Sequence, residues 1–204
     1  MTSRFLNLVF SPSVKAAQQQ SGSRDAYAKR DGATEPDRLT ENEAQFIATR
    51  DSFYMASVGA GGWPYVQHRG GPPGFVKVLG ERTLGLADFR GNRQYVSVGN
   101  LADDNRVALF MMDYARRARL KLLGHARTVD LAGAPDLAAA LIDQTYGAKI
   151  ERGIIIDIEA FDWNCPQHIT PRFTLSEIEP SIVALKSRIA ELETELARIG
   201  PAPK

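Results

Sequence analysis

The chain has 204 residues, of which 25 are basic, 24 are acidic and one is a cysteine. This length suits one packed domain with an appendage, and the balanced charge excludes the electrostatic footprint of a nucleic-acid binder. A single cysteine excludes an internal disulfide, and no stretch approaches the roughly 20 apolar residues that span a bilayer. The apolar run FLNLVF is too short for a signal-peptide core. We therefore expect a cytoplasmic protein that binds neither nucleic acid nor membranes.

Two helical segments are predicted at the start of the chain. Residues 1–35 are expected to form a loosely attached N-terminal arm with one short helix near SVKAAQQQ. A second helix is predicted after Thr40, because Thr40 and Glu43 have the spacing of a capping box. Phe46 and Ile47 follow as the buried side of this helix.

Short strands are predicted from Ser52 to about Asp130. Six segments are β-branched or aromatic and are separated by Gly and Pro: SFYMASVG, PYVQHR, FVKVL, TLGLADF, RVALFMMD and RARLKLLGHARTVD. The breaks AGGWP, GGPPG and LGER predict hairpins or bulges, and the polar segment GNRQYVSVGNLADDN predicts a short helix. This pattern indicates a mainly β, α+β fold with a six-stranded antiparallel barrel or sandwich.

Two further elements complete the main domain, which we expect to span residues 36–175. APDLAAALIDQTYG predicts a helix that ends at Gly147, and GIIIDIEAFDWN predicts a last strand. The run from Ile154 to Ile158 is apolar enough to be buried on both faces. The segment FDWNCPQHITPR therefore follows a core strand, where side chains are held rigidly yet can reach a ligand.

The C-terminal segment, residues 176–204, predicts a helix with an apolar seam. Apolar residues alternate there in steps of three and four over about two and a half heptads. Such a seam either pairs as a coiled coil or packs on the main domain, and both remain open. The seam residues are Ile182, Leu185, Ile189, Leu192, Leu196 and Ile199.

The segment FDWNCPQHITPR has three possible chemistries. Cys165 and His168 have a Cys-x-x-His spacing that could supply half of a zinc site, but His68 and His125 lie in predicted strands without a ligand-spaced neighbour. A thiol nucleophile would need a lowered thiol pKa and a positioned base. The third possibility is a proline-stiffened loop that clamps a flat ligand.

Two basic, glycine-containing corners indicate anion binding. FRGNRQY places Arg90, Asn92 and Arg93 where a strand gives way to a helix, so that backbone N–H groups, the helix dipole and a guanidinium could converge on a phosphate. The alternative is a solvated turn. HRGGPPG supplies a second corner with Arg69, and Lys77 follows one strand further on.

The order of these segments resembles the pyridoxamine 5'-phosphate oxidase-like family of FMN-binding split β-barrels, over roughly residues 40–172. The resemblance is carried by PYVQHRGGPPGFVKV, LADFRGNRQYVSVGNLADDNRVALFMMD, RARLKLLGHARTVD and FDWNCPQHITPR. It implies a six-stranded antiparallel split β-barrel with peripheral helices and a C-terminal helix. It also implies a bound FMN, and a homodimer with the cofactor at the subunit interface.

The resemblance further implies cofactor contacts for individual residues. Arg69 and Lys77 match the Arg and Lys that the family lends to the flavin and its phosphate. GNR occupies the place of the segment that grips the phosphate, with Asn92 and Arg93 as its polar members. Arg119 stands where the family has a Gln that approaches the flavin.

The last motif completes the implied site. Trp163 and Arg172 match a Trp and an Arg that line the flavin in the family, often from the partner subunit. We expect Asn164, Gln167 and His168 near the flavin ring. His168 is either a catalytic proton donor or a structural hydrogen-bonding group.

The resemblance implies an FMN-dependent oxidoreductase that transfers hydride between FMN and a small-molecule substrate, without a metal. True pyridoxamine phosphate oxidases carry an Arg-x-His-Asp-Arg type segment after the Trp, where this chain has NCPQHITPR, so we expect another substrate. The alternatives are a non-enzymatic flavin or tetrapyrrole binding or storage protein, and a reductase that uses the deazaflavin F420.

Overall fold

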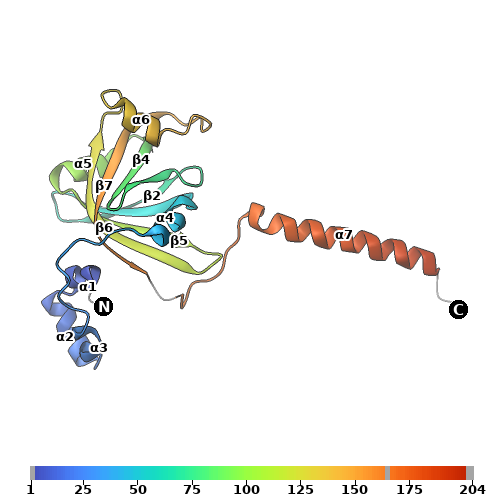
Figure 1. The fold of residues 1–204 in the computed structure, drawn as a ribbon, viewed down its shortest axis with the longest axis horizontal. Coiled ribbons are helices and arrows are strands. Elements are labelled where there is room, and N and C mark those ends of the chain that lie inside the picture. The colour runs from blue at the N-terminus through green and yellow to red at the C-terminus, as the bar shows by residue number, and fades with distance from the viewer. Residues whose placement is uncertain (1–2, 164–165, 201–204) are drawn as a thin grey trace. The chain divides into compact units, whose positions relative to one another are not determined.

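The computed structural model describes residues 3–163 and 166–200 of the chain (Figure 1). The chain divides into two compact units. The first unit comprises Met1–Asp113 and Ala118–Pro166, and the second comprises Tyr114–Arg117 and Gln167–Lys204.

The first unit is built around one sheet, and all six described strand pairings in it are antiparallel. Its strands are β1 (Ser52–Val58), β2 (Pro64–Gly70), β3 (Val76–Gly80), β4 (Thr83–Phe89), β5 (Arg106–Asp113), β6 (Ala118–Val129) and β7 (Ile150–Trp163). Their order across the sheet is β2-β1-β5-β6-β7-β4-β3. The predicted mainly β, α+β class is therefore confirmed.

Two parts of the predicted topology are wrong. The described sheet has seven strands rather than six, because β7 pairs with both β6 and β4. The sheet is also not closed, since β2 and β3 stand at the two ends of the strand order. The GGPPG segment joins these two edge strands, so it does not form a hairpin between paired neighbours.

The main core lies on one face of this sheet. Alternate residues of β5 are buried there, as the period of two in a strand requires. In β7 both faces are buried from Ile154 to Ile156: Ile154 and Ile156 lie in the main core, whereas Ile155 packs with Leu131 and Leu141 in a second cluster. The prediction of a strand buried on both faces is confirmed for these three residues, but Asp157 is only partly buried.

The predicted helix after Thr40 is α4 (Glu41–Ala48), and it begins with the expected capping box. Ile47 is fully buried on its inner side. The polar segment between β4 and β5 contains α5 (Val96–Asp103), as predicted. Helix α6 (Pro135–Leu141) is shorter than expected, because it ends at Leu141 and not at Gly147.

The N-terminal arm contains three short helices rather than one: α1 (Arg4–Val9), α2 (Pro12–Gln20) and α3 (Arg24–Ala28). Phe5 and Leu6 of α1 are buried against Ala160 of β7, and Arg4 forms an ion pair with Glu159. The first helix of the arm is therefore packed on the sheet.

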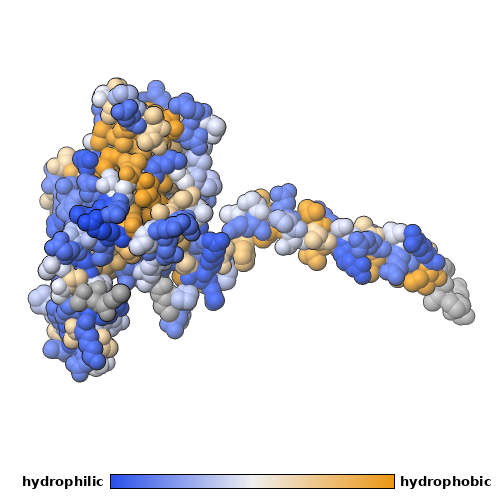
Figure 2. Space-filling model, in the orientation of Figure 1, coloured by the Kyte–Doolittle hydropathy of each residue, from blue (hydrophilic) through white to orange (hydrophobic). Residues whose placement is uncertain are grey.

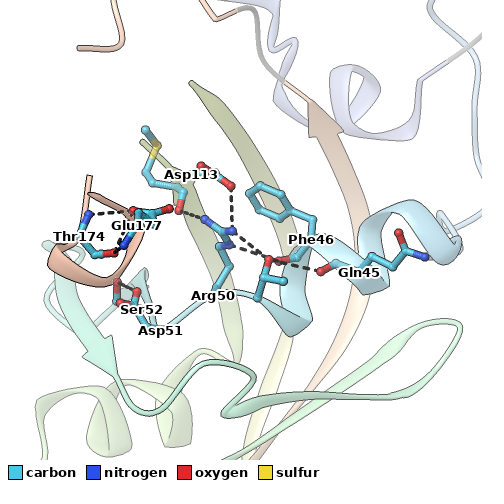
Figure 3. A network of polar contacts seen from close by, with 10 residues as sticks. Gln45, Phe46, Arg50, Asp51, Ser52, Asp113, Thr174 and Glu177 are labelled. Carbon is cyan, nitrogen blue, oxygen red and sulfur yellow. Dashed lines mark hydrogen bonds and ion pairs between the residues drawn. The ribbon is translucent and has the colours of Figure 1, made fainter. Parts of the chain in front are cut away.

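Arg50 ties the end of α4 to the end of β5 (Figure 3). Its guanidinium donates hydrogen bonds to the carbonyl oxygen of Met112, at 2.9 Å, and to the carboxylate of Asp113, at 2.8 Å. The same group lies 4.7 Å from the centre of the Phe46 ring. Asp113 is buried, so this ion pair lies inside the first unit and fixes the end of α4 against β5.

The second unit contains one long helix, α7 (Leu175–Ile199), which has 25 residues. It begins with a capping box between Thr174 and Glu177 (Figure 3) and includes Pro180. None of its residues, all of which are described, is buried. Figure 2 shows apolar and hydrophilic residues interspersed along it. Of the helices in the described ranges, none is both long and apolar enough to cross a membrane.

Candidate functional site

A pocket of ≈ 240 Å³ opens where β2, β4 and the start of α5 meet. It is lined by Arg69 at the end of β2 and by Arg90, Asn92 and Arg93 in the loop between β4 and α5. The two basic corners that the sequence singles out, HRGGPPG and FRGNRQY, therefore lie in one site although they are about twenty residues apart.

Asp88 holds two guanidinium groups beside this pocket. Arg69 Nη1 lies 2.5 Å from Asp88 Oδ1, and Arg152 Nε lies 3.4 Å from Asp88 Oδ2. The Nε atom of Arg69 is buried and has no hydrogen-bond partner among the described residues. A buried donor without an acceptor costs roughly 1–3 kcal/mol, so this atom indicates a place for a ligand oxygen.

Glu151 organises the other side of the pocket. Its carboxylate accepts hydrogen bonds from Arg90 Nε, at 2.7 Å, from the Tyr95 hydroxyl, at 3.2 Å, and from Arg152 Nη2, at 3.1 Å. The hydrogen bond from Arg90 is the largest cause that lowers the pKa of Glu151 below its ordinary value. Glu151 is thus ionised at neutral pH and holds both Arg90 and Tyr95 in position.

The loop that enters α5 has an unusual backbone. Arg93 and Tyr95 have φ angles of 63° and 53°, in the left-handed region that bulky residues rarely adopt. Each such residue costs about 1–3 kcal/mol, and such strain clusters at ligand-binding sites. Asn92 supports the turn, because its Oδ1 accepts a hydrogen bond from the Gln94 N–H at 3.1 Å.

The first turn of α5 and Arg93 are the groups best suited to hold an anion. No described side chain caps α5 at Tyr95, so the first N–H groups of the helix keep their donor capacity. Arg69 and Arg90 each have a carboxylate partner, whereas no described carboxylate forms an ion pair with Arg93. The Tyr95 side chain and then the charge of Glu151 raise the pKa of Arg93, which is therefore always cationic.

Sequence reasoning missed several residues of this pocket. Ser97 is buried and donates a hydrogen bond to Gln67 Oε1 at 2.8 Å, which joins α5 to β2. Asp88 was detectable as an acidic residue within the apolar strand TLGLADF, because buried carboxylates are almost always paired. Glu151 carried no such signal, since only the pairing of β4 with β7 brings it to the site.

Lys77 and Arg119 are outside the described pocket lining. Lys77 lies on β3 opposite Gly85, and its charge is a minor cause of the lowered pKa of Asp143, after the hydrogen bonds from Thr145. Arg119 lies on β6, with its guanidinium 5.9 Å from the centre of the Phe110 ring. The cofactor contacts implied for them stay predictions.

Trp163 packs against α4 in the first unit. Its indole Nε1 donates a hydrogen bond to Glu43 Oε1 at 2.7 Å, and its ring meets Phe46 edge-on with the centroids 4.8 Å apart. Within one subunit, this side chain therefore holds α4 to the end of β7. A contact with a flavin in a partner subunit stays a prediction.

Of the other site residues predicted in FDWNCPQHITPR, some lie outside the described residues and the rest belong to the second unit. Asn164 and Cys165 lie outside the described residues. Gln167, His168 and Arg172 belong to the second unit, where His168 is exposed with a φ of 61°. Arg172 lies 5.0 Å from the centre of the Tyr114 ring, in the same unit. Their roles at a cofactor stay predictions.

A metal centre has no support within the described ranges. No group of three or more His, Cys, Asp or Glu residues there is arranged to hold a metal ion. The pocket instead gathers arginines, an amide and a helix start, which is a donor set for an anionic ligand.

The family model described as pyridoxamine 5'-phosphate oxidase matches residues 39–181 of this chain. This range is more than two thirds of the chain and includes every residue of the pocket. The chain therefore belongs to the pyridoxamine 5'-phosphate oxidase-like family, as the order of its motifs predicts.

The solved structures that match this chain have low sequence identity to it. A protein related to general stress protein 26 from Clostridium acetobutylicum is 16% identical, with a TM-score of 0.44, and the match covers 67% of this chain and 94% of that one. An FMN-binding protein from Syntrophomonas wolfei is 13% identical, with a TM-score of 0.43 and coverage of 75% and 95%. The heme storage protein HutZ from Vibrio cholerae is 16% identical, with a TM-score of 0.39 and coverage of 61% and 94%. No curated protein matches the chain.

Proposed function

We propose that this protein binds FMN through the pocket between β2, β4 and α5, and that it works as an FMN-dependent oxidoreductase. The observation that carries the proposal is the convergence of Arg69, Asn92 and Arg93 on one pocket at the uncapped start of α5. A phosphate group satisfies what this arrangement lacks, because it offers several acceptor oxygens and negative charge.

The size of the pocket supports a site that encloses only one part of the cofactor. At ≈ 240 Å³ it lies below the roughly 300–1,000 Å³ of a site that encloses a whole cofactor. It suits the phosphate and the adjoining polyol chain of FMN. The flat ring would then lie beyond the pocket, where a second subunit can cover it.

An exposed apolar face supports a homodimer. A second hollow of ≈ 350 Å³ on the first unit is lined almost entirely by apolar groups, among them Tyr54, Val66 and Phe110. Tyr54 is 40% exposed and Val66 is 60% exposed. Contiguous exposed apolar surface of this kind marks interaction sites. We infer that a second copy covers this face and that the FMN ring lies at the interface.

The protein and the cofactor would have different tasks. FMN, when bound, supplies the hydride chemistry, and the protein supplies orientation and electrostatics. Arg93 and the α5 amides would hold the phosphate, while Asp88 and Glu151 keep the other arginines in place. His168 is the proton donor we propose at the ring, and NCPQHITPR, which departs from the segment that recognises pyridoxamine phosphate, points to another substrate.

An absorption spectrum of the purified protein tests the proposal. We expect flavin bands and release of FMN on denaturation, or uptake of added FMN by the colourless protein. Riboflavin, which has the same ring and no phosphate, is the matched control and should bind more weakly. A protein that ignores FMN but takes up hemin or F420 would instead support a tetrapyrrole storage protein or an F420-dependent reductase.

A further inference from the structure

The capped start of α7 lengthens its apolar seam. Because the helix begins at Leu175, behind the capping box of Thr174 and Glu177, Leu175 and Ile178 join the seam. The apolar residues then recur in steps of three and four over about three and a half heptads, which is the length typical of a coiled coil. The α7 seam consists of Leu175, Ile178, Ile182, Leu185, Ile189, Leu192, Leu196 and Ile199.

The proline within α7 does not interrupt the seam. Numbered with Leu175 at heptad position a, Pro180 falls at position f, on the face opposite the seam. Its missing N–H therefore removes one hydrogen bond on the outer face of the helix. The seam itself continues without a break from Ile178 to Ile182.

The seam is exposed from Ile182 to Ile199. Leu185 is 65% exposed, Ile189 is 55% exposed and Leu196 is 68% exposed. A helix derives most of its stability from packing of its apolar face, so this face needs a partner.

We propose that the partner is α7 of a second copy of this chain, in a parallel two-stranded coiled coil. The central core positions carry the evidence: Ile182 and Ile189 are at position a, and Leu185 and Leu192 are at position d. β-branched residues at a with leucine at d favour parallel dimers over trimers and tetramers. The two ends of the seam have the reverse order, with leucine at a and isoleucine at d, so the preference for a dimer rests on the central heptads and on the flanking charges.

The charges that flank the seam select the parallel orientation. In a parallel pair, Arg188 at position g lies next to Glu193 at position e of the second copy, and two-fold symmetry forms this attractive pair twice. In an antiparallel pair, Lys186 would lie beside Lys186 and Arg188 beside Arg188. Within one helix Arg188 bonds to Glu191 at 2.9 Å, but an exposed pair of this kind contributes little to stability. Arg188 can therefore exchange this partner for Glu193 of the second copy.

This coiled coil does not depend on a bound flavin. It is two-fold symmetric, as is a dimer formed through the apolar face of the sheet, so each contact by itself closes at two chains. Failure to bind FMN would leave the coiled coil untouched.

Disulfide cross-linking of the full chain tests the proposal. In a Cys165→Ser background, Leu192→Cys should form covalent dimers in high yield on mild oxidation, because equivalent d positions face each other in a parallel pair. Ser187→Cys, at position f on the opposite face, is the matched control and should stay monomeric on a denaturing gel. The native mass by light scattering should correspond to two chains of 22.4 kDa.

Other arrangements give different results. An antiparallel pair would link Leu192→Cys chains only to Ile182→Cys chains in a mixture, because position a then meets position d. The proposal would be overturned if Leu192→Cys formed no cross-link, or if the native mass corresponded to three chains. Absence of the cross-link would mean that the seam packs against another surface.

Charge reversal gives a second, independent measurement. In the Leu192→Cys background, Arg188→Glu or Glu193→Arg alone should lower the cross-linking yield several-fold, because each places like charges together. An equimolar mixture of the two variants should restore the yield as heterodimers. An antiparallel pair would give no link in any of these samples, since Leu192→Cys does not face its equivalent there.

Discussion

Arg69 and Arg93 line the same pocket, but only Arg69 forms an ion pair with a described carboxylate. Arg69 is held by Asp88 at 2.5 Å, whereas no described carboxylate pairs with Arg93. Arg69 therefore shapes the site, and Arg93 keeps its charge for a ligand. The left-handed backbone at Arg93 is consistent with this role, because strain of this kind persists where binding requires it.

Replacing Arg93 with Ala should weaken FMN binding about 10- to 100-fold, since a hydrogen bond to a charged group contributes about 1.5–3 kcal/mol. Ala retains a Cβ, so the strain at this position is unchanged. Riboflavin binding should not change, because it has no phosphate. Fluorescence titration measures both, with Arg127→Ala as the control at an exposed arginine paired with Asp157. Equal losses for both ligands would contradict a phosphate role.

Glu43 shows how a single buried carboxylate holds the fold together. Its two oxygens accept hydrogen bonds from the Thr40 N–H, the Thr40 hydroxyl, Asn42 and the Trp163 indole. Burial acts to raise its pKa, but the hydrogen bonds from Thr40 and Trp163 outweigh it, and the pKa is lowered from its ordinary value of 4.5. The ionised form is therefore the one that the folded protein stabilises.

Glu43→Gln should destabilise the first unit by about 1–3 kcal/mol, because the new amide presents N–H donors to groups that are donors themselves. Since the folded pKa is depressed, the stabilisation by Glu43 is present above pH 4.5 and is lost as the pH falls through the folded value. Thermal unfolding from pH 3 to 7 should thus show that the difference in thermal midpoint between wild type and variant becomes smaller as the pH falls. Glu41→Gln, at an exposed position of the same helix, is the control.

At the scale of elements, a glycine marks the irregularity that lets β6 and β7 pair along their length. The register between them shifts between Leu123 and Gly124. A Cβ on Gly124 would lie 2.4 Å from the carbonyl oxygen of Asp157. Backbone cannot yield as a flexible side chain can, so only glycine fits there.

Gly124→Ala should therefore lower the free energy of unfolding by about 1–3 kcal/mol, as overpacking against rigid neighbours does. Gly99→Ala is the matched control, because Gly99 lies within α5 with open space around its Cβ position. That substitution should be stabilising by about 0.5–1 kcal/mol. Chemical denaturation of both variants measures the two changes in the free energy of unfolding. Similar values for both would show that the irregularity at Gly124 tolerates a side chain.

At the scale of the whole molecule, the described apolar clusters contain no residue of α7. The core of the first unit comes from its own strands and from α1, α4, α5 and α6. Helix α7 therefore does not contribute to that core.

Removing residues 174–204 should leave the first unit folded, with a cooperative thermal transition whose midpoint falls only because the dimer is weaker. The truncated protein should dissociate at higher concentration than the full chain, because it lacks the α7 contact. Circular dichroism and analytical ultracentrifugation measure the two effects. A loss of cooperative unfolding would show instead that α7 supports the fold.

Local patterns predicted much of this protein. The strand segments, the capping box at Thr40, the short helix before β5 and the family were all evident from residue types and their spacing. These features depend on neighbours within a few positions, or on motif order, so the linear sequence contains them. The seam of α7 was evident for the same reason, although its start required the position of the helix cap.

Only the tertiary structure decided the strand count, the order of the strands and the composition of the pocket. Asp88 and Arg152 are register partners across β4 and β7, although 63 positions separate them in the chain. Such pairings arise from burying apolar faces against distant segments, and no local period specifies which segments meet. The sequence by itself thus determined which residues could bind an anion, and the packing of the sheet determined which of them share a site.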